Sequence, residues 1–147
     1  MSNIATTISQ SRKLIELGLD QNTANMYYPY LGAGMYGNTP RVGFPIEHSG
    51  GRDIPAWSLS ALLEVIPAMI VYPTWVDKRP TDVWFNLDKD YNSETKKQFY
   101  MCYYKSLDTH QIATNTDPSH SSPIDAAYEM VCWLLENNLI KKGDSDE

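Results

Sequence analysis

The stretch SSPIDAAYEMVCWLLENNLI, residues 121–140, predicts an amphipathic helix that closes a globular fold. Ser122 offers a side-chain oxygen as N-cap, and Pro123 suits the first helical position. Apolar residues then recur at spacings of three and four, as on one buried helical face. The residues with this spacing are Ile124, Ala127, Tyr128, Val131, Leu134 and Leu135. Asn137 or Asn138 can take the left-handed C-cap, so we expect a core helix with a defined end.

The composition indicates a single globular domain that spans residues 1–147. The chain is 42% apolar and 20% charged, which is typical of a folded protein and too apolar for a disordered one. Aromatic residues are abundant, with ten Tyr and four Trp. Their rings combine an apolar body with a polar atom, so they suit either half-buried sheet surfaces or a binding surface.

The charge argues against a protein that binds a nucleic-acid duplex. The formal net charge is −6, and no basic stripe is present to neutralise several phosphates. The polar N-terminus does not resemble a signal peptide, and no apolar run is long enough to span a membrane. Cys102 and Cys132 fall in apolar contexts, which predicts buried thiols in a reducing compartment. We therefore expect a cytoplasmic protein without a membrane partner.

Cap signals place a first helix at residues 8–17. Thr7 and Gln10 have the spacing of a capping box, and Gly18 fits the helix stop. Asp20 is then expected to cap a short second helix at residues 21–26.

A further helix is predicted from Trp57 or Ser58 to Ile66, where Pro67 ends it. The apolar run at residues 69–72 follows as an edge strand.

Alternating apolar and polar residues predict three more strands. The pattern predicts a hairpin whose strands are residues 81–88 and 98–105, joined by the turn-rich segment 89–95. A weaker third strand is predicted at residues 109–114. Short polar connections imply an antiparallel meander. The expected fold class is α+β, with N-terminal helices, a three- to four-stranded antiparallel sheet and a C-terminal helix packed on the sheet. The acidic end, residues 141–147, is expected to be a flexible tail.

Residues 32–55 form a long Gly/Pro-rich segment that is expected to be a loop. It holds six of the eight glycines together with Arg41, His48 and Arg52. Loops of this length inside a compact domain are uncommon and often functional. The string G-x-G-x-x-G at residues 32–37 lacks a surrounding βαβ unit, so it predicts a turn rather than a dinucleotide site.

The combination of this loop with aromatic residues expected on the exposed sheet face predicts a ligand site. Arginine and aromatic faces together hold nucleobases and phosphates. The candidate ligand-binding residues are Arg41, Arg52, His48, Trp84, Tyr100 and Tyr104. The alternative is that the aromatic residues brace cross-strand pairs or a subunit interface.

Catalytic and metal signals are weak. The three histidines lack paired metal-ligand spacing, so neither a metal nor another cofactor is expected. A small hydrolase acting on a nucleotide or sugar would have to use His48 or His120 with a nearby Asp, such as Asp117 beside His120.

Three segments give the chain a family likeness: LIELGLDQNTANM (14–26), IPAWSLSALLEVIP (54–67) and PIDAAYEMVCWLLENN (123–138). Together they resemble a family of small, uncharacterised proteins encoded by bacteriophages and prophages of gut anaerobes. The resemblance implies an accessory protein in the cytoplasm of a bacterial host.

The leading hypothesis is thus a non-enzymatic, homo-oligomeric binding protein. Its partner would be a small molecule, with nucleotides among the candidates, or a host protein. The alternatives are the hydrolase and a phage structural or assembly protein.

Overall fold

The computed structural model describes residues 4–44, 51–73 and 80–143, and it confirms the predicted α+β class. The helices are α1 (Ile8–Glu16), the 3-10 helix η1 (Gln21–Thr23), α2 (Leu59–Val65) and α3 (Pro123–Glu136). The strands are β1 (Met26–Tyr28), β2 (Tyr30–Gly32), β3 (Met35–Tyr36), β4 (Arg41–Val42), β5 (Ile54–Ala56), β6 (Met69–Pro73), β7 (Pro80–Asn92), β8 (Lys97–Ser106) and β9 (Ile112–Asn115).

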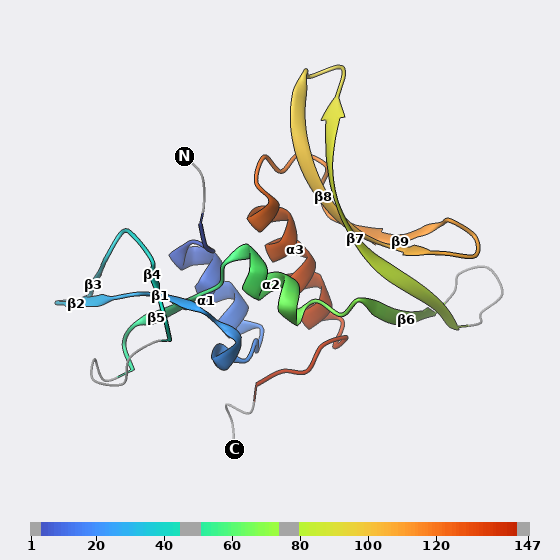
Figure 1. Cartoon of the computed structure of the whole chain (residues 1–147). Coiled ribbons are helices and arrows are strands. Elements are labelled where there is room, and N and C mark those ends of the chain that lie inside the picture. The colour runs from blue at the N-terminus through green and yellow to red at the C-terminus, as the bar shows by residue number, and fades with distance from the viewer. Residues whose placement is uncertain (1–3, 45–50, 74–79, 144–147) are drawn as a thin grey trace.

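The helices separate two groups of strands (Figure 1). On one side, β6, β7, β8 and β9 form the expected antiparallel meander, and α3 packs on β8. On the other side, a three-stranded sheet in the order β4-β1-β5 lies beside α1, and β2 and β3 form a separate hairpin. The main core fills the space between the four-stranded sheet and the helices, while a smaller cluster lies under β1 and β5.

The caps of α1 follow the sequence prediction. The Thr7 hydroxyl accepts from the Gln10 backbone, and the Gln10 side chain accepts from the Thr7 backbone, which completes the capping box. At the other end Gly18 has φ +102°, and the Leu19 amide donates to the Leu14 carbonyl. This is a Schellman ending, and it fixes the direction in which the chain leaves α1.

The ends of α3 also agree with the prediction. Ser122 caps its N-terminus and Pro123 occupies the first turn. Asn138 has φ +56°, and the Leu139 amide donates to the Leu134 carbonyl in a second Schellman ending. The buried residues of α3 are Ile124, Ala126, Ala127, Met130, Val131, Leu134 and Leu135. Burial of the larger side chains in this set, those of Ile, Met, Val and Leu, stabilises the fold by roughly 1.5–3 kcal/mol each.

The prediction of which side of β8 faces solvent was wrong. Tyr104 is fully buried and its hydroxyl donates to the Pro67 carbonyl at 2.6 Å, while Tyr100 packs half-buried against the core. The alternate residues Met101 and Tyr103 lie on the outer face. The pattern was ambiguous because β8 has large side chains on both faces, and a one-residue shift exchanges the two faces of a strand.

Other boundaries also differ from the prediction. Helix η1 stops at Thr23, and Met26 already belongs to β1. The expected loop at residues 32–55 contains β3, β4 and the start of β5, and residues 45–50 lie outside the described part.

The weaker strand predicted at residues 109–114 is β9, which begins three residues later than expected. Residues 141–143 of the expected flexible tail pack against the end of α1 through a hydrogen bond from the Gly143 amide to the Gly18 carbonyl. Residues 144–147 lie outside the described residues.

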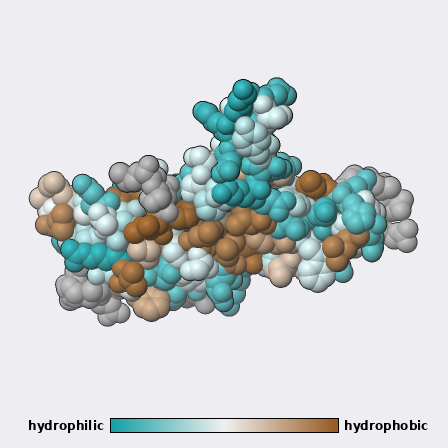
Figure 2. Space-filling model, turned by 45° about the horizontal axis from the view of Figure 1, so that its top comes forward, coloured by the Kyte–Doolittle hydropathy of each residue, from teal (hydrophilic) through white to brown (hydrophobic). Residues whose placement is uncertain are grey.

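The hairpin of β7 and β8 extends beyond the body as an arm (Figure 1). Its strands pair continuously as far as Asn92 and Lys97, and residues 88–98 are all exposed. Figure 2 shows the arm as a largely hydrophilic projection, with apolar residues gathered on the body near its base. The arm therefore has no apolar core of its own.

Candidate functional site

The structure does not bring the predicted ligand-binding residues together. Arg41 lies exposed on β4 and Arg52 precedes β5, both in the part of the chain near α1. Trp84, Tyr100 and Tyr104 lie on the four-stranded sheet, where Tyr104 is in the core. His48 falls outside the described residues.

Arg52 does contact an aromatic ring, as the hypothesis required, but the ring is Tyr30 rather than Trp84, Tyr100 or Tyr104. Its guanidinium lies 5.3 Å from the centre of the Tyr30 ring, which meets Tyr36 edge-on. Arg12 lies 5.6 Å from the centre of the Tyr36 ring. These cation–π contacts brace the β2–β3 hairpin against α1 and the segment before β5.

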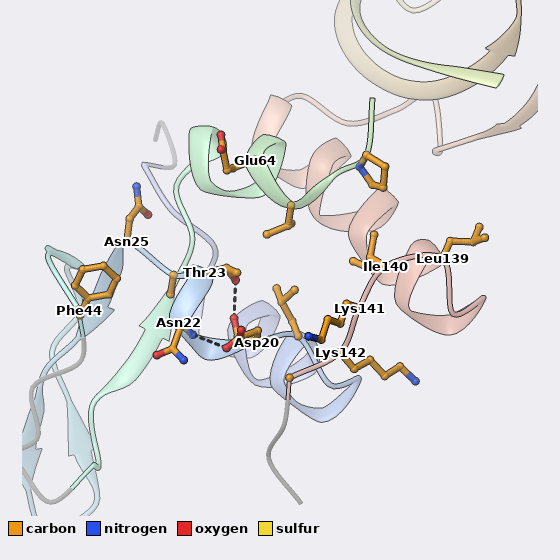
Figure 3. Close-up of a pocket in the computed structure, with 15 residues that line it drawn as sticks. Asp20, Asn22, Thr23, Asn25, Phe44, Glu64, Leu139, Ile140, Lys141 and Lys142 are labelled. Atoms are coloured by element: carbon orange, nitrogen blue, oxygen red, sulfur yellow. Dashed lines mark hydrogen bonds between the residues drawn. The ribbon is translucent and has the colours of Figure 1, made fainter. Parts of the chain in front are cut away.

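A cavity of about 750 Å³ lies elsewhere, between the end of α2 and the C-terminal segment, residues 139–143. We call it the C-terminal pocket. It is lined by residues 19–20, 22–25 and 64–65, by Phe44 and Pro67, and by the C-terminal segment. Figure 3 shows Phe44 on one side and the C-terminal segment on the opposite side. Its volume lies in the range of sites that hold small organic molecules.

Hydrogen bonds fix the wall of the pocket that is built from residues 20–25. The Trp57 indole N–H donates to the Thr23 hydroxyl at 2.9 Å, and this hydroxyl donates to the Asp20 carbonyl at 2.5 Å. Asn25 and Ser58 exchange two hydrogen bonds of 2.7 and 3.1 Å. Because Trp57 is completely buried, this wall is anchored in the main core.

The opposite wall depends on two glycines that allow close approach of the chain. A Cβ atom at Gly143 would lie 3.0 Å from the Asp20 Cα atom, and one at Gly18 would lie 3.0 Å from the Lys142 side chain. Together with the Gly143–Gly18 hydrogen bond of 2.8 Å, this contact holds the C-terminal segment against the end of α1. The pocket is therefore built from four separate parts of the sequence, residues 19–25, Phe44, residues 64–67 and residues 139–143.

Apolar side chains make up much of the lining, and charged groups add polarity. The apolar lining residues are Leu19, Ala24, Phe44, Val65, Pro67, Leu139 and Ile140. Glu64 on one wall and Lys141 and Lys142 on the other add opposite charges. The ion pairs of the described residues, Lys13–Glu16 and His120–Glu129, include none of these three groups. They are thus available to an ionised ligand.

His120 has a different partner from the one predicted. Its Nε2 atom lies 2.6 Å from the Glu129 carboxylate on α3, and the Asp117 backbone N–H donates to the same carboxylate. Asp117 therefore does not orient His120 through its side chain. The His120–Glu129 contact links the segment before α3 to the helix.

The two cysteines are free thiols. Burial, followed by the negative charge of Glu129, raises the pKa of the Cys102 thiol to about 12. Burial also raises the pKa of Cys132. Both thiols are therefore protonated near neutral pH and poorly nucleophilic, as predicted from their apolar contexts.

Within residues 4–44, 51–73 and 80–143, no three His, Cys, Asp or Glu side chains are grouped so as to hold a metal ion. No α-helix in these ranges combines the length and apolar character needed to cross a bilayer. Comparison of the chain with family models, curated proteins and solved structures finds no match.

The residues of the C-terminal pocket were missed by sequence reasoning, although one signal was present. Residues 19–25 and 139–140 were recognised only as helix ends and their surroundings. The signal is the pair of Schellman endings of α1 and α3, each followed by a short segment that mixes polar and apolar residues. Such connecting segments lie at the surface and often carry binding residues.

Proposed function

We propose that this protein binds a small organic molecule in the C-terminal pocket and does not transform it. The observation that carries the proposal is a preformed cavity, largely apolar, whose charged groups Glu64 and Lys141 take part in no ion pair within the described part of the chain. Ligand sites commonly combine an apolar lining with a few polar groups that fix orientation.

The lining defines the chemical class of the ligand. Phe44 and the neighbouring aliphatic residues suit an apolar or aromatic body, and Lys141 suits a carboxylate or phosphate. Glu64 suits a donor such as an amine. A nucleotide meets these requirements, but so does any aromatic metabolite with an acidic group. The arginines of the original hypothesis take no part in this site.

A binding role fits the chemistry of the nearby groups better than hydrolysis does. The His120–Glu129 pair lies outside the set of residues that line the pocket, and both thiols have a raised pKa. An accessory protein of a phage type, acting in the host cytoplasm by sequestering a small molecule, is the biological setting that we propose.

Native mass spectrometry after incubation with a bacterial extract tests the proposal. The wild-type chain is expected to carry an added small mass that acid releases unchanged. A Val65→Trp variant fills the pocket, and Lys141→Ala removes one charge, so both should lose the added mass. Glu16→Gln changes an exposed charge on α1 outside the pocket and should retain it. A released product of altered mass would instead indicate an enzyme.

A further inference from the structure

An apolar row crosses the outer face of the four-stranded sheet, on the side away from α3. Strand register places Met69, Trp84, Lys105 and Ile112 directly beside one another on β6, β7, β8 and β9. The exposed fractions are 37% for Met69, 40% for Trp84 and 46% for Ile112. Val71, on the same face of β6, is 52% exposed. We call this set, with Lys105, the outer-face row.

This composition is unusual for a sheet face that meets water. Antiparallel sheets with one solvated face normally place polar residues there, because the other face already forms the core. Here Val83, Phe85 and Leu87 supply the core side of β7, and Trp84 between them faces outward. On this face Met69, Val71 and Trp84 adjoin one another, and Lys105 separates Trp84 from Ile112. Exposed apolar residues that gather on one face within a polar surround are typical of an interaction site.

The charges around the row indicate which partner fits it. Lys105 lies within the row, and Asp82 lies two residues before Trp84 on the same face of β7. Neither side chain has an ion-pair partner among the residues that the structure describes. A face that carries one unpaired positive and one unpaired negative group is complementary to a second copy of itself.

A two-fold axis can satisfy both charges at once. Neighbouring strands lie about 4.8 Å apart, and residues two apart on a strand lie about 6.6 Å apart. Consider a two-fold axis that lies in the plane of the face and crosses the line from Lys105 to Asp82 at its midpoint, at a right angle. Rotation about this axis places Lys105 of each copy over Asp82 of the partner subunit. Trp84 adjoins both residues, so it lies beside this axis and meets Trp84 of the partner subunit. Such an isologous contact closes as a dimer.

We propose that the outer-face row is the self-association surface of this protein, covered by the same face of a second copy. Two sheets then pack face to face, with the Trp84 rings at the centre and the Lys105–Asp82 pairs around them. This interface leaves the C-terminal pocket untouched, since none of its lining residues belongs to the row.

Sedimentation velocity over a range of protein concentrations tests the proposal. The wild-type chain should pass from monomer to dimer, and Trp84→Lys and Ile112→Lys should each remain monomeric. Val42→Lys is the matched control, because Val42 is 84% exposed on β4 and lies outside the row. It should dimerise as the wild type does. Thermal unfolding followed by circular dichroism confirms that each variant is folded.

Exchange of the two charges distinguishes this specific pairing from non-specific hydrophobic association. Lys105→Asp and Asp82→Lys each create like charges across the axis, so each should weaken dimerisation at least about tenfold. The double variant restores opposite charges and should recover wild-type dimerisation. A wild-type chain that stays monomeric would overturn the proposal, and the outer-face row would then be a candidate surface for binding a different protein. Dimers that survive Trp84→Lys, or a double variant no better than the singles, would overturn it as well.

Discussion

Replacement of Tyr104 by Phe tests which face of β8 packs against the core. Tyr104 is fully buried, its ring centre lies 5.6 Å from that of Phe85, and its hydroxyl donates to the Pro67 carbonyl at 2.6 Å. The variant keeps the ring and removes only the hydroxyl. The Pro67 carbonyl then loses a partner at a part-buried position, where an acceptor left without one costs about 1–3 kcal/mol.

We expect Tyr104→Phe to lower the free energy of unfolding by about 1.5–2 kcal/mol. For a chain of this length that loss lowers Tm by about 4–6 °C. The assay is thermal and urea unfolding followed by circular dichroism, with unchanged urea dependence of the unfolding free energy as evidence that only stability has changed.

Tyr103→Phe is the matched control on the neighbouring residue. Tyr103 lies on the outer face, where its hydroxyl donates to Asp88 at 2.7 Å in an exposed position. Its loss should change stability by less than about 0.5 kcal/mol. If Tyr103→Phe destabilises the protein more than Tyr104→Phe does, the two faces of β8 are exchanged and our account of the core is wrong.

Three further predictions concern single groups. The hydrogen bond to Asp88 is the largest factor that raises the pKa of Tyr103, to about 12, so the folded state keeps a proton that the unfolded chain loses near pH 10. The free energy of unfolding should therefore fall between about pH 10 and 12, and it should fall less in Tyr103→Phe. Urea unfolding at a series of pH values measures both, and the same dependence of the unfolding free energy on pH in the two proteins would contradict the prediction. Loss of the N-cap in Ser122→Ala should cost about 1 kcal/mol in thermal unfolding, whereas Ser121→Ala should be neutral; equal effects would contradict the assigned cap. Mass-spectrometric counting after iodoacetamide treatment should show Cys102 unmodified in the native protein and modified in denaturant. Rapid native modification would show that the thiol is accessible.

Local signals predicted the helices because their ends are specified by neighbouring residues. The Thr7–Gln10 capping box, the Ser122 cap and the left-handed positions Gly18 and Asn138 each act within one helical turn. The hairpin of β7 and β8 was predictable for the same reason, since its strands are joined by a short polar turn.

Features that depend on distant residues could not be predicted in this way. The side of β8 that meets the core is decided by α3 and by the Pro67 carbonyl, not by the β8 sequence, which is aromatic on both faces. The strands β4 and β5 are short, and each is held in the sheet by pairing with β1. Likewise, the C-terminal pocket combines residues 19–25 with residues 139–143, which the Gly143–Gly18 hydrogen bond brings together from distant parts of the sequence.

Amide NMR shift mapping tests the binding site most directly. The ¹⁵N-labelled protein would be titrated with the small-molecule fraction of a bacterial extract. Our account predicts shifts for amides of residues 19–25, 64–65 and 139–143, with none on the arm at residues 88–98. Shifts confined to the arm, or to the four-stranded sheet, or an unchanged spectrum, would contradict a small-molecule site in the C-terminal pocket.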